Sequence, residues 1–233
     1  MLRALVGDDF EMFSEVRTRN GAWLTDWEPV RPSAMADPAV NFESFSRRCE
    51  LRDRERGAGN AYTFGVFVDS ILCGEINLNG VSRGSMQSAT IGYWIDRTKA
   101  GHGYVPEAVV VLTRYAFEQL RLHRLEICII PRNENSLRVV QKLAWRHEGR
   151  AERFLEINGV WEDHDRLASP PKSGKRVPKN SRAPGSSASR FSLVAPQGAR
   201  ETTADESTTP AGLVRTPLLR HAMAPHRSRE SSS

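Results

Sequence analysis

Two glycines, Gly101 and Gly103, stand where a predicted strand gives way to a predicted helix. Residues 89–95 are rich in β-branched and aromatic side chains, and apolar residues recur at helical spacing from residue 105 onward. A glycine turn between a strand and a helix directs several backbone N–H groups, and the positive end of the helix dipole, at one point. Such a point suits a phosphate or a diphosphate, so this turn is the first candidate for binding chemistry.

The surroundings of this turn favour phosphate binding over a plain turn. A G-x-G pair alone is a weak signal, because most such pairs only reverse the chain. Here Arg97, Lys99 and His102 add positive potential, and a turn from strand to helix is the context that a phosphate cradle requires. No third glycine follows at the spacing of a Rossmann fold, which disfavours a dinucleotide.

A polar segment follows the fully apolar run at residues 125–130. Asn133 is typical of a helix N-cap with Ser136 in the first turn, and this structural interpretation suffices by itself. The functional interpretation places both side chains at the end of a strand beside the first one, facing the same cleft. Arg138 and Lys142 share a helix face and could meet an anionic ligand. The residues alone leave both interpretations open.

A carboxylate and an amide lie on one predicted strand, residues 71–78. Strand alternation places Glu75 and Asn77 on the same face as Ile71 and Cys73. Such polar groups on an interior strand need a cleft, water or a partner. Glu75 is therefore a candidate base or substrate clamp, and a paired structural carboxylate is an equally good interpretation.

The elements that must position these residues alternate between helices and strands. Helical spacing predicts helices over residues 9–20, 39–57, 105–120 and 135–143. Strand patterns cover residues 62–68, 71–78, 89–95 and 125–130, and a hairpin pairs 152–157 with 160–164 through Asn158-Gly159. This order predicts a mixed α/β fold with a largely antiparallel sheet and one helical crossover.

Composition divides the 233 residues into a domain and a tail. Residues 1–168 hold 22 Lys and Arg against 24 Asp and Glu, whereas residues 169–233 hold 11 against 4, a net charge of +7. The tail has 8 of the 13 prolines and one aromatic residue, Phe191, so it is expected to be disordered. Its charge permits weak attraction to nucleic acid, although a solvated appendage without a partner is the simpler expectation.

Cysteine usage and hydropathy argue against several classes of protein. Cys49, Cys73 and Cys128 are widely spaced and form no C-x-x-C pair, so the sequence supports neither a disulfide framework nor a zinc site, and no metal is expected. The N-terminus lacks the apolar stretch of a signal peptide, and no segment approaches about 18 consecutive apolar residues. We expect a protein of the reducing cytoplasm with no membrane partner.

Six short motifs, taken together, resemble a known family. They are Ile91-Gly-Tyr-Trp-Ile95, Gly101-His-Gly-Tyr104, Pro106-Glu-Ala108, Asn133-x-x-Ser136, Lys142-Leu-Ala-Trp145 and Asn158-Gly-Val-Trp-Glu-Asp163. In this order they resemble the GNAT N-acetyltransferases, and most closely the branch that acetylates N-terminal α-amines of ribosomal proteins. The resemblance covers about residues 2–167. It implies an α/β fold of the α+β kind, in which helices flank both faces of a mixed, mostly antiparallel sheet.

The resemblance also implies roles for individual residues. Those implied in binding acetyl-CoA are Trp94 and Ile95 (pantetheine arm), Gly101, His102, Gly103, Tyr104 and Val105 (backbone amides, diphosphate), and Asn133 (pantetheine). Ser136 would lie near the thiol and protonate the leaving thiolate, and Glu75 is the candidate base, directly or through water. Trp23, Trp27 and Asn77 would frame the acceptor amine, together with the helices at 9–20 and 39–57.

Several positions depart from the family pattern. The family often has Gln or Arg at the position of Ala100, and Gly or Ala at that of Val105. Many members carry a tyrosine general acid where this chain has Val140, so that role passes to Ser136 in our interpretation. Ala144 replaces a glycine that ends the helix, and a left-handed alanine there would cost about 1 kcal/mol.

The ends of the chain differ from the family as well. The first strand of the family begins several residues earlier than Met1 allows, and the last strand continues past the position of Leu167. We hypothesise a displaced start codon with an out-of-frame end, or a divergent tail.

The reaction that the resemblance implies is direct transfer of an acetyl group from acetyl-CoA to a primary amine. The first expectation for the acceptor is the N-terminal α-amine of a protein such as a ribosomal protein. Three alternatives stay open: a catalytically impaired acyl-CoA-binding module, an acetyltransferase of a small-molecule amine, and a nucleic-acid-associated protein that acts through its basic tail.

Overall fold

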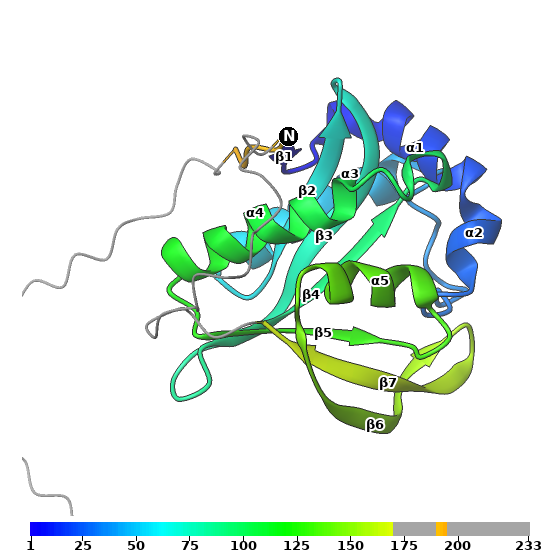
Figure 1. The fold of residues 1–233 in the computed structure, drawn as a ribbon. Helices are drawn as coiled ribbons and strands as arrows, with labels where there is room; N and C mark the ends of the chain where they lie inside the picture. Colours follow the sequence, from blue (N-terminus) through cyan, green and yellow to red (C-terminus); the bar gives the residue numbers. More distant parts are fainter. Residues whose placement is uncertain (170–189, 195–233) are drawn as a thin grey trace, which may run out of the picture. The chain divides into compact units, whose positions relative to one another are not determined.

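The computed structural model describes residues 1–169 and 190–194, which contain one mixed sheet with helices on both faces (Figure 1). The strands are β1 (Leu2–Arg3), β2 (Tyr62–Val68), β3 (Ile71–Ser82), β4 (Ser88–Ile95), β5 (Arg124–Ile129), β6 (Arg146–Ile157) and β7 (Val160–Ala168). The α-helices are α1 (Phe10–Arg19), α2 (Gly21–Thr25), α3 (Phe42–Gly57), α4 (Tyr104–Glu118) and α5 (Glu134–Lys142), and two 3-10 turns, η1 (Gly7–Asp9) and η2 (Arg97–Lys99), precede α1 and α4.

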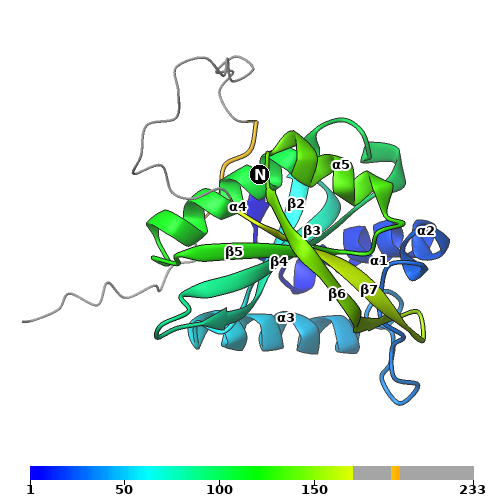
Figure 2. The same cartoon turned by 60° about the horizontal axis from the view of Figure 1, so that its bottom comes forward.

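Within these described residues the sheet has the order β1-β2-β3-β4-β5-β7-β6. Neighbouring strands are antiparallel except β4 and β5, which run parallel and are connected by α4. A parallel pair requires such a crossover, because a tight turn can only join antiparallel strands. Helices α1 and α3 cover one face and α4 and α5 the other (Figures 1 and 2). The predicted fold class is thereby confirmed.

Two hairpin turns form where the local sequence predicts them. Asp69 and Ser70 join β2 to β3 with φ values of +50° and +64°, and Asn158 and Gly159 join β6 to β7 with φ values of +47° and +79°. Two consecutive residues at positive φ match the right-handed twist of the strands that they connect. Strand β6 begins several residues earlier than its predicted start at residue 152.

The core lies on both faces of the sheet. The larger cluster packs α4 and α5 against β2–β5, and α4 contributes Ala108, Val109, Leu112, Tyr115 and Ala116 at helical spacing. The smaller cluster packs α1 and α3 against Phe67 and Leu72.

A bulge in β3 overturns part of the predicted strand alternation. Leu72 pairs with Phe67 and Gly74 pairs with Val66, so Cys73 has no residue opposite it in this register. Its thiol turns into the larger core and donates to the Val66 carbonyl at 3.1 Å. The prediction that Cys73 shares a face with Glu75 and Asn77 was therefore wrong, because one extra residue shifts every preceding side chain to the other face.

The predictions for the basic tail, residues 169–233, concern mostly residues that the structure does not describe. Residues 170–189 and 195–233, to which the predicted disorder and nucleic-acid attraction apply, are not described. Residues 190–194 are an exception, because they have a defined position against the domain. In the described ranges no helix has the length and apolarity to span a membrane, and no three His, Cys, Asp or Glu side chains are arranged to hold a metal ion.

Candidate active site

Strands β4 and β5 separate after a short parallel ladder, and this separation creates the site. Their pairing runs from Ser88–Arg124 to Thr90–Glu126. Beyond Thr90 the β5-facing edge of β4 has no strand partner among the described residues, while its other edge stays paired with β3 as far as Ile95. A cavity of about 730 Å³ lies here, and its lining comes from both strands and from helices on both faces of the sheet. This volume is in the range of small-molecule sites.

The predicted glycine turn lies at one part of this cavity. Gly101 has φ of +80° and Gly103 has φ of +85°, and Gly103 is the N-cap residue of α4 without a side-chain hydrogen bond to the first turn. Non-glycine residues rarely adopt such φ values, so both glycines serve the turn itself. The first N–H groups of α4 are consequently left without an N-cap side chain, and they suit an anion.

Asp96 anchors the end of β4 just before this turn. It is 1% exposed, caps η2 by accepting from the Thr98 N–H at 3.1 Å, and accepts from Arg19 Nη2 at 2.6 Å and Asn20 Nδ2 at 3.1 Å. Burial opposes its ionised form, but these hydrogen bonds outweigh burial and lower the pKa of Asp96. The ion pair ties α1 to the segment that leads into the glycine turn.

The start of α5 supplies the next wall. Asn133 Oδ1 accepts from the Ser136 N–H at 3.1 Å, so Asn133 is the N-cap that the sequence predicted, and both residues also line the cavity. The Tyr93 hydroxyl, from β4, lies 3.5 Å from the Ser136 carbonyl. Burial raises the pKa of Tyr93 from its ordinary value near 10 to about 12, so this phenol is protonated at neutral pH and stays so in mildly alkaline solution.

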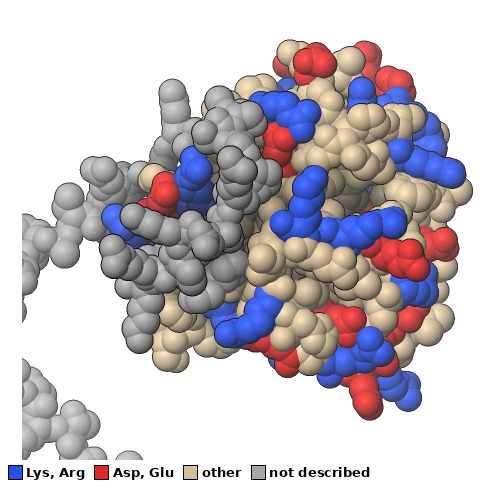
Figure 3. All heavy atoms as spheres, viewed as in Figure 1, with Lys and Arg blue, Asp and Glu red and all other residues tan. Residues whose placement is uncertain are grey.

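Three cations line the same cavity. Lys99 precedes the glycine turn, and Arg138 and Lys142 lie on α5, as the predicted shared helix face requires. On the face drawn in Figure 3, Lys and Arg side chains gather between α4 and α5. This positive charge suits a ligand with several phosphate groups.

The α2 side of the cavity is aromatic. Trp23 lies within α2, and Trp27 follows this helix; both are partly buried and line the cavity. Arg132 lies 4.7 Å from the centre of the Trp27 ring. The Asn158 N–H donates to the Glu28 carbonyl at 2.9 Å, so the β6–β7 hairpin braces this segment.

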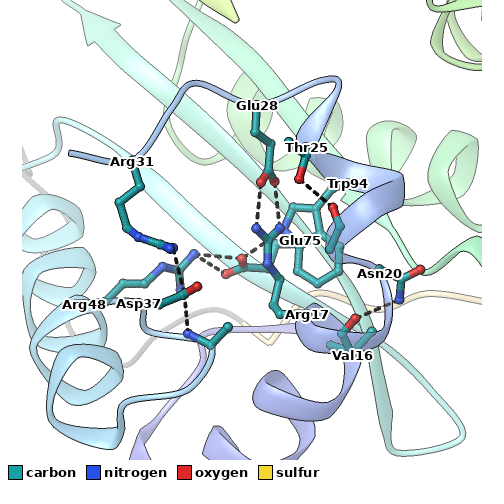
Figure 4. A network of polar contacts seen from close by, with 12 residues as sticks. Val16, Arg17, Asn20, Thr25, Glu28, Arg31, Asp37, Arg48, Glu75 and Trp94 are labelled. Atoms are coloured by element: carbon teal, nitrogen blue, oxygen red, sulfur yellow. Dashed lines mark hydrogen bonds and ion pairs between the residues drawn. The ribbon is translucent and has the colours of Figure 1, made fainter. Parts of the chain in front are cut away.

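Glu75 belongs to a network of charged groups beside the cavity (Figure 4). It is 3% exposed, and its two oxygens accept from Arg48 Nη2 at 2.8 and 2.7 Å. Oε2 also accepts from the Trp94 indole Nε1 at 3.1 Å. A second pair, Arg17 with Glu28, is bidentate at 2.7 and 2.6 Å, and Arg17 lies 5.0 Å from the Trp94 ring. Glu75 therefore holds the Trp94 side chain in place.

The cavity brings most of the predicted site residues together. Those that line it are Trp23, Trp27, Asn77, Trp94, Ile95, Gly101, Gly103, Tyr104, Val105, Asn133 and Ser136. Glu75 and His102 do not line it; the His102 ring is exposed, with Nδ1 2.9 Å from the Ala100 carbonyl. Whether any of these residues binds or catalyses stays a prediction.

Sequence reasoning missed other lining residues. Tyr93, Cys128 and His164 line the cavity, and the buried His164 has Nδ1 2.9 Å from the Glu162 carbonyl. Tyr93 lies inside a motif that the sequence singled out, and strand alternation from Trp94 could have placed it. The pairing of β7 with β5, which brings His164 to the site, has no local signal in the sequence.

Comparisons with known proteins agree with this arrangement. The family model described as "Acetyltransferase (GNAT) domain" matches residues 1–146. A probable N-acetyltransferase of Bacillus subtilis, YjcK, is 45% identical over 169 residues, which are 72% of this chain and 91% of that protein.

Two further relatives have more specific descriptions. The [ribosomal protein uS5]-alanine N-acetyltransferase of Escherichia coli is 28% identical over 166 residues, covering 70% of this chain and 84% of its own length. The solved structure of Mycobacterium smegmatis RimJ in complex with CoA-disulfide superposes with a TM-score of 0.67 at 29% identity, covering 72% of this chain and 79% of that one.

Proposed function

Because the chain belongs to the GNAT acetyltransferase family and is an N-acetyltransferase, we propose that it acetylates the N-terminal α-amine of a protein, such as a ribosomal protein, with acetyl-CoA as donor. One observation carries this proposal. A single cavity extends from the glycine turn of α4, through the separation of β4 and β5, to Trp23 and Trp27 beside α2. A donor and an acceptor can therefore approach one point from different faces of the sheet.

The residues present fit a coenzyme A thioester. The turn at 101–105 offers main-chain N–H groups at a helix start for a diphosphate, and Lys99, Arg138 and Lys142 complement its negative charge. The free edge of β4 at Trp94 and Ile95 offers backbone groups to an amide-containing pantetheine arm, as a neighbouring strand would. Asn133 lies at the start of α5 beside this edge. When bound, the donor supplies an acetyl group already activated as a thioester.

The chain's own contribution is mainly positioning and charge stabilisation. N–H groups on the free β4 edge can stabilise an oxyanion as the acetyl group is transferred. Ser136 is our candidate proton donor to the leaving thiolate, and the protonated Tyr93 phenol near it is a further hydrogen-bond donor. A free α-amine has an ordinary pKa near 8, so it must lose a proton before it attacks.

The group that takes this proton is predicted to be Glu75. Its bonds to Arg48 and Trp94 support a second role, which is to hold the Trp94 side chain. Glu75→Gln separates the two roles, because glutamine can still accept from the indole but cannot act as a base. If Glu75 acts as the base, Glu75→Gln should lower kcat/KM about 100-fold and leave the Kd of CoA nearly unchanged. A variant that keeps its kcat would make Glu75 a positioning residue only.

The acceptor is tested with matched peptides. One peptide carries a free N-terminal alanine and no lysine, and a second has a blocked N-terminus and one internal lysine. We expect the full-length enzyme to consume acetyl-CoA with the first peptide and to leave the second unchanged, as mass spectrometry of the products shows. Acetylation of spermidine or another small amine in place of the free N-terminus would contradict the proposed acceptor while preserving the family's chemistry.

A further inference from the structure

Residues 190–194 lie against the edge of the sheet, far along the chain from the strand that they contact. Leu193 forms a parallel bridge with Leu2 of β1, and backbone hydrogen bonds of 2.7 and 2.9 Å flank this bridge. Phe191 is 6% exposed and belongs to the larger core cluster. These contacts fix the segment on the domain, and they determine where Arg190 lies.

Arg190 lies over the turn that opens α4. Its Nε donates to Glu107 Oε1 at 2.8 Å, and its Nη2 donates to the same oxygen and, at 3.3 Å, to the His102 carbonyl. The guanidinium carbon is 5.2 Å from the centre of the Tyr104 ring. A Cβ built on Gly103 would stand 3.4 Å from Arg190 Nη2. The guanidinium is thus in contact with the residues proposed to hold a diphosphate.

Glu107 explains why a cation is needed at this point. It lies in the first turn of α4, where the helix dipole stabilises a carboxylate. The same carboxylate repels a phosphate that approaches the first N–H groups of the helix. Arg190 binds its Oε1, whereas Oε2 is buried and has no hydrogen-bond partner among the described residues. Without Arg190, an uncompensated negative charge would stand beside the turn.

We propose that Arg190 is a further binding residue of the acetyl-CoA site, an inference that rests on the proposed function. Arg190 neutralises Glu107 and, with its side chain 57% exposed, presents its remaining N–H donors beside Gly103. A planar guanidinium matches two oxygens of a phosphate group at once. The segment at 190–194 is then part of the donor site, and donor binding and docking of this segment stabilise each other.

Calorimetric titration of the full-length protein with CoA tests this role. We expect Arg190→Ala to raise the Kd of CoA about tenfold, the effect of one lost charge-assisted contact. Arg47→Ala is the matched control, because Arg47 is also an exposed arginine paired with a glutamate, but on α3. The Kd of CoA for Arg47→Ala should equal that of the wild type. An Arg190→Ala protein that binds CoA as well as the wild type, or more tightly, overturns the inference.

Two further measurements separate a diphosphate contact from a general structural effect. With S-acetylpantetheine, which lacks the diphosphate, Arg190→Ala should leave kcat/KM unchanged, and an equal loss with both donors overturns the inference. In a Glu107→Gln background the effect of Arg190→Ala should shrink, because there is less charge to neutralise. A wild-type protein that binds no CoA would instead contradict the proposed function itself, so the two failures are distinguishable.

Discussion

Helices α4 and α5 begin at the same cavity, yet their first turns are completed in different ways. The N-cap of α5, Asn133, uses its own side chain to accept the Ser136 N–H. The N-cap of α4, Gly103, has no side chain, and its φ of +85° orients the turn without occupying the space in front of it. The start of α5 is capped by a side chain, and the start of α4 has no side-chain cap from its N-cap residue, as the proposed ligand site requires.

The charges around the two helix starts deepen this difference. At α4 the carboxylate of Glu107 is held by Arg190, a residue from a distant part of the chain. At α5 the cations Arg138 and Lys142 lie on the helix itself and line the cavity. Two similar sequence features, each a turn followed by a helix, therefore differ in structure, because only α5 has an N-cap side chain that accepts a hydrogen bond from its first turn.

The largest effect is expected from a substitution at the start of α4, which has no N-cap side chain. Gly103→Val places a β-branched side chain at positive φ, where it is strongly disfavoured, and against Arg190. We expect the Kd of CoA, measured by calorimetry, to rise roughly 100-fold. Gly57→Val is the control, because Gly57 has no positive φ and a Cβ there would meet no neighbouring atom within 4 Å. An unchanged Kd in Gly103→Val would remove the turn from the binding site.

The anchor of the α4 turn gives the next largest effect, on stability. Asp96→Asn should lower the free energy of unfolding by about 2–3 kcal/mol at pH 7, because the Arg19 charge loses its buried partner. The folded pKa of Asp96 is lowered, so its contribution is present above the unfolded value of about 3.9 and is lost as the pH falls through the folded value. Urea unfolding should therefore show the two proteins converging below pH 4, and a constant difference would contradict this origin.

A substitution at the start of α5, which Asn133 caps, should change mainly the free energy of unfolding. Asn133→Ala removes the acceptor for the Ser136 N–H and should lower the free energy of unfolding by about 1 kcal/mol. Asn133→Ser keeps a capping oxygen and should recover most of this loss. A rise in the Kd of CoA as large as that of Gly103→Val would show that both helix starts bind the donor, and the comparison would fail.

The smallest effect is expected at the C-terminal end of α5, where it concerns the free energy of unfolding alone. Ala144 follows the end of α5 with φ of +54°, as its replacement of a family glycine predicts. Ala144→Gly should raise the free energy of unfolding by about 0.5–1 kcal/mol, because alanine is strained in this conformation. Thermal unfolding by circular dichroism measures the gain, with Ala151→Gly in β6 as a control that should be destabilising.

The sequence predicted those parts of the fold that local chemistry decides. The hairpin at Asn158-Gly159, the long apolar periodicity of α4 and the cap at Asn133 depend on neighbouring residues, so they could be read without tertiary structure. Gly101 and Gly103 were singled out from the same local context, whereas Trp94 and Ile95 were named only through the family resemblance; all four line the cavity, and their roles stay predictions.

Features that depend on distant pairing could not be predicted. Glu75 meets Arg48 across 27 positions, and no spacing rule connects a strand carboxylate to a particular arginine. The bulge at Cys73 results from the fit of β3 against β2, and strict alternation misplaced that thiol. Phe191 has no strand or helix pattern around it, so its burial beside Tyr104 could not be inferred from composition.

The bridge between Leu193 and Leu2 has a practical consequence for producing this protein. Without it, the outer main-chain N–H and C=O groups of Leu2 would become an exposed sheet edge, the kind of surface on which separate molecules add strand to strand. We expect a recombinant version shortened to residue 169 to form concentration-dependent aggregates in light scattering, and one that ends after residue 194 to remain dispersed.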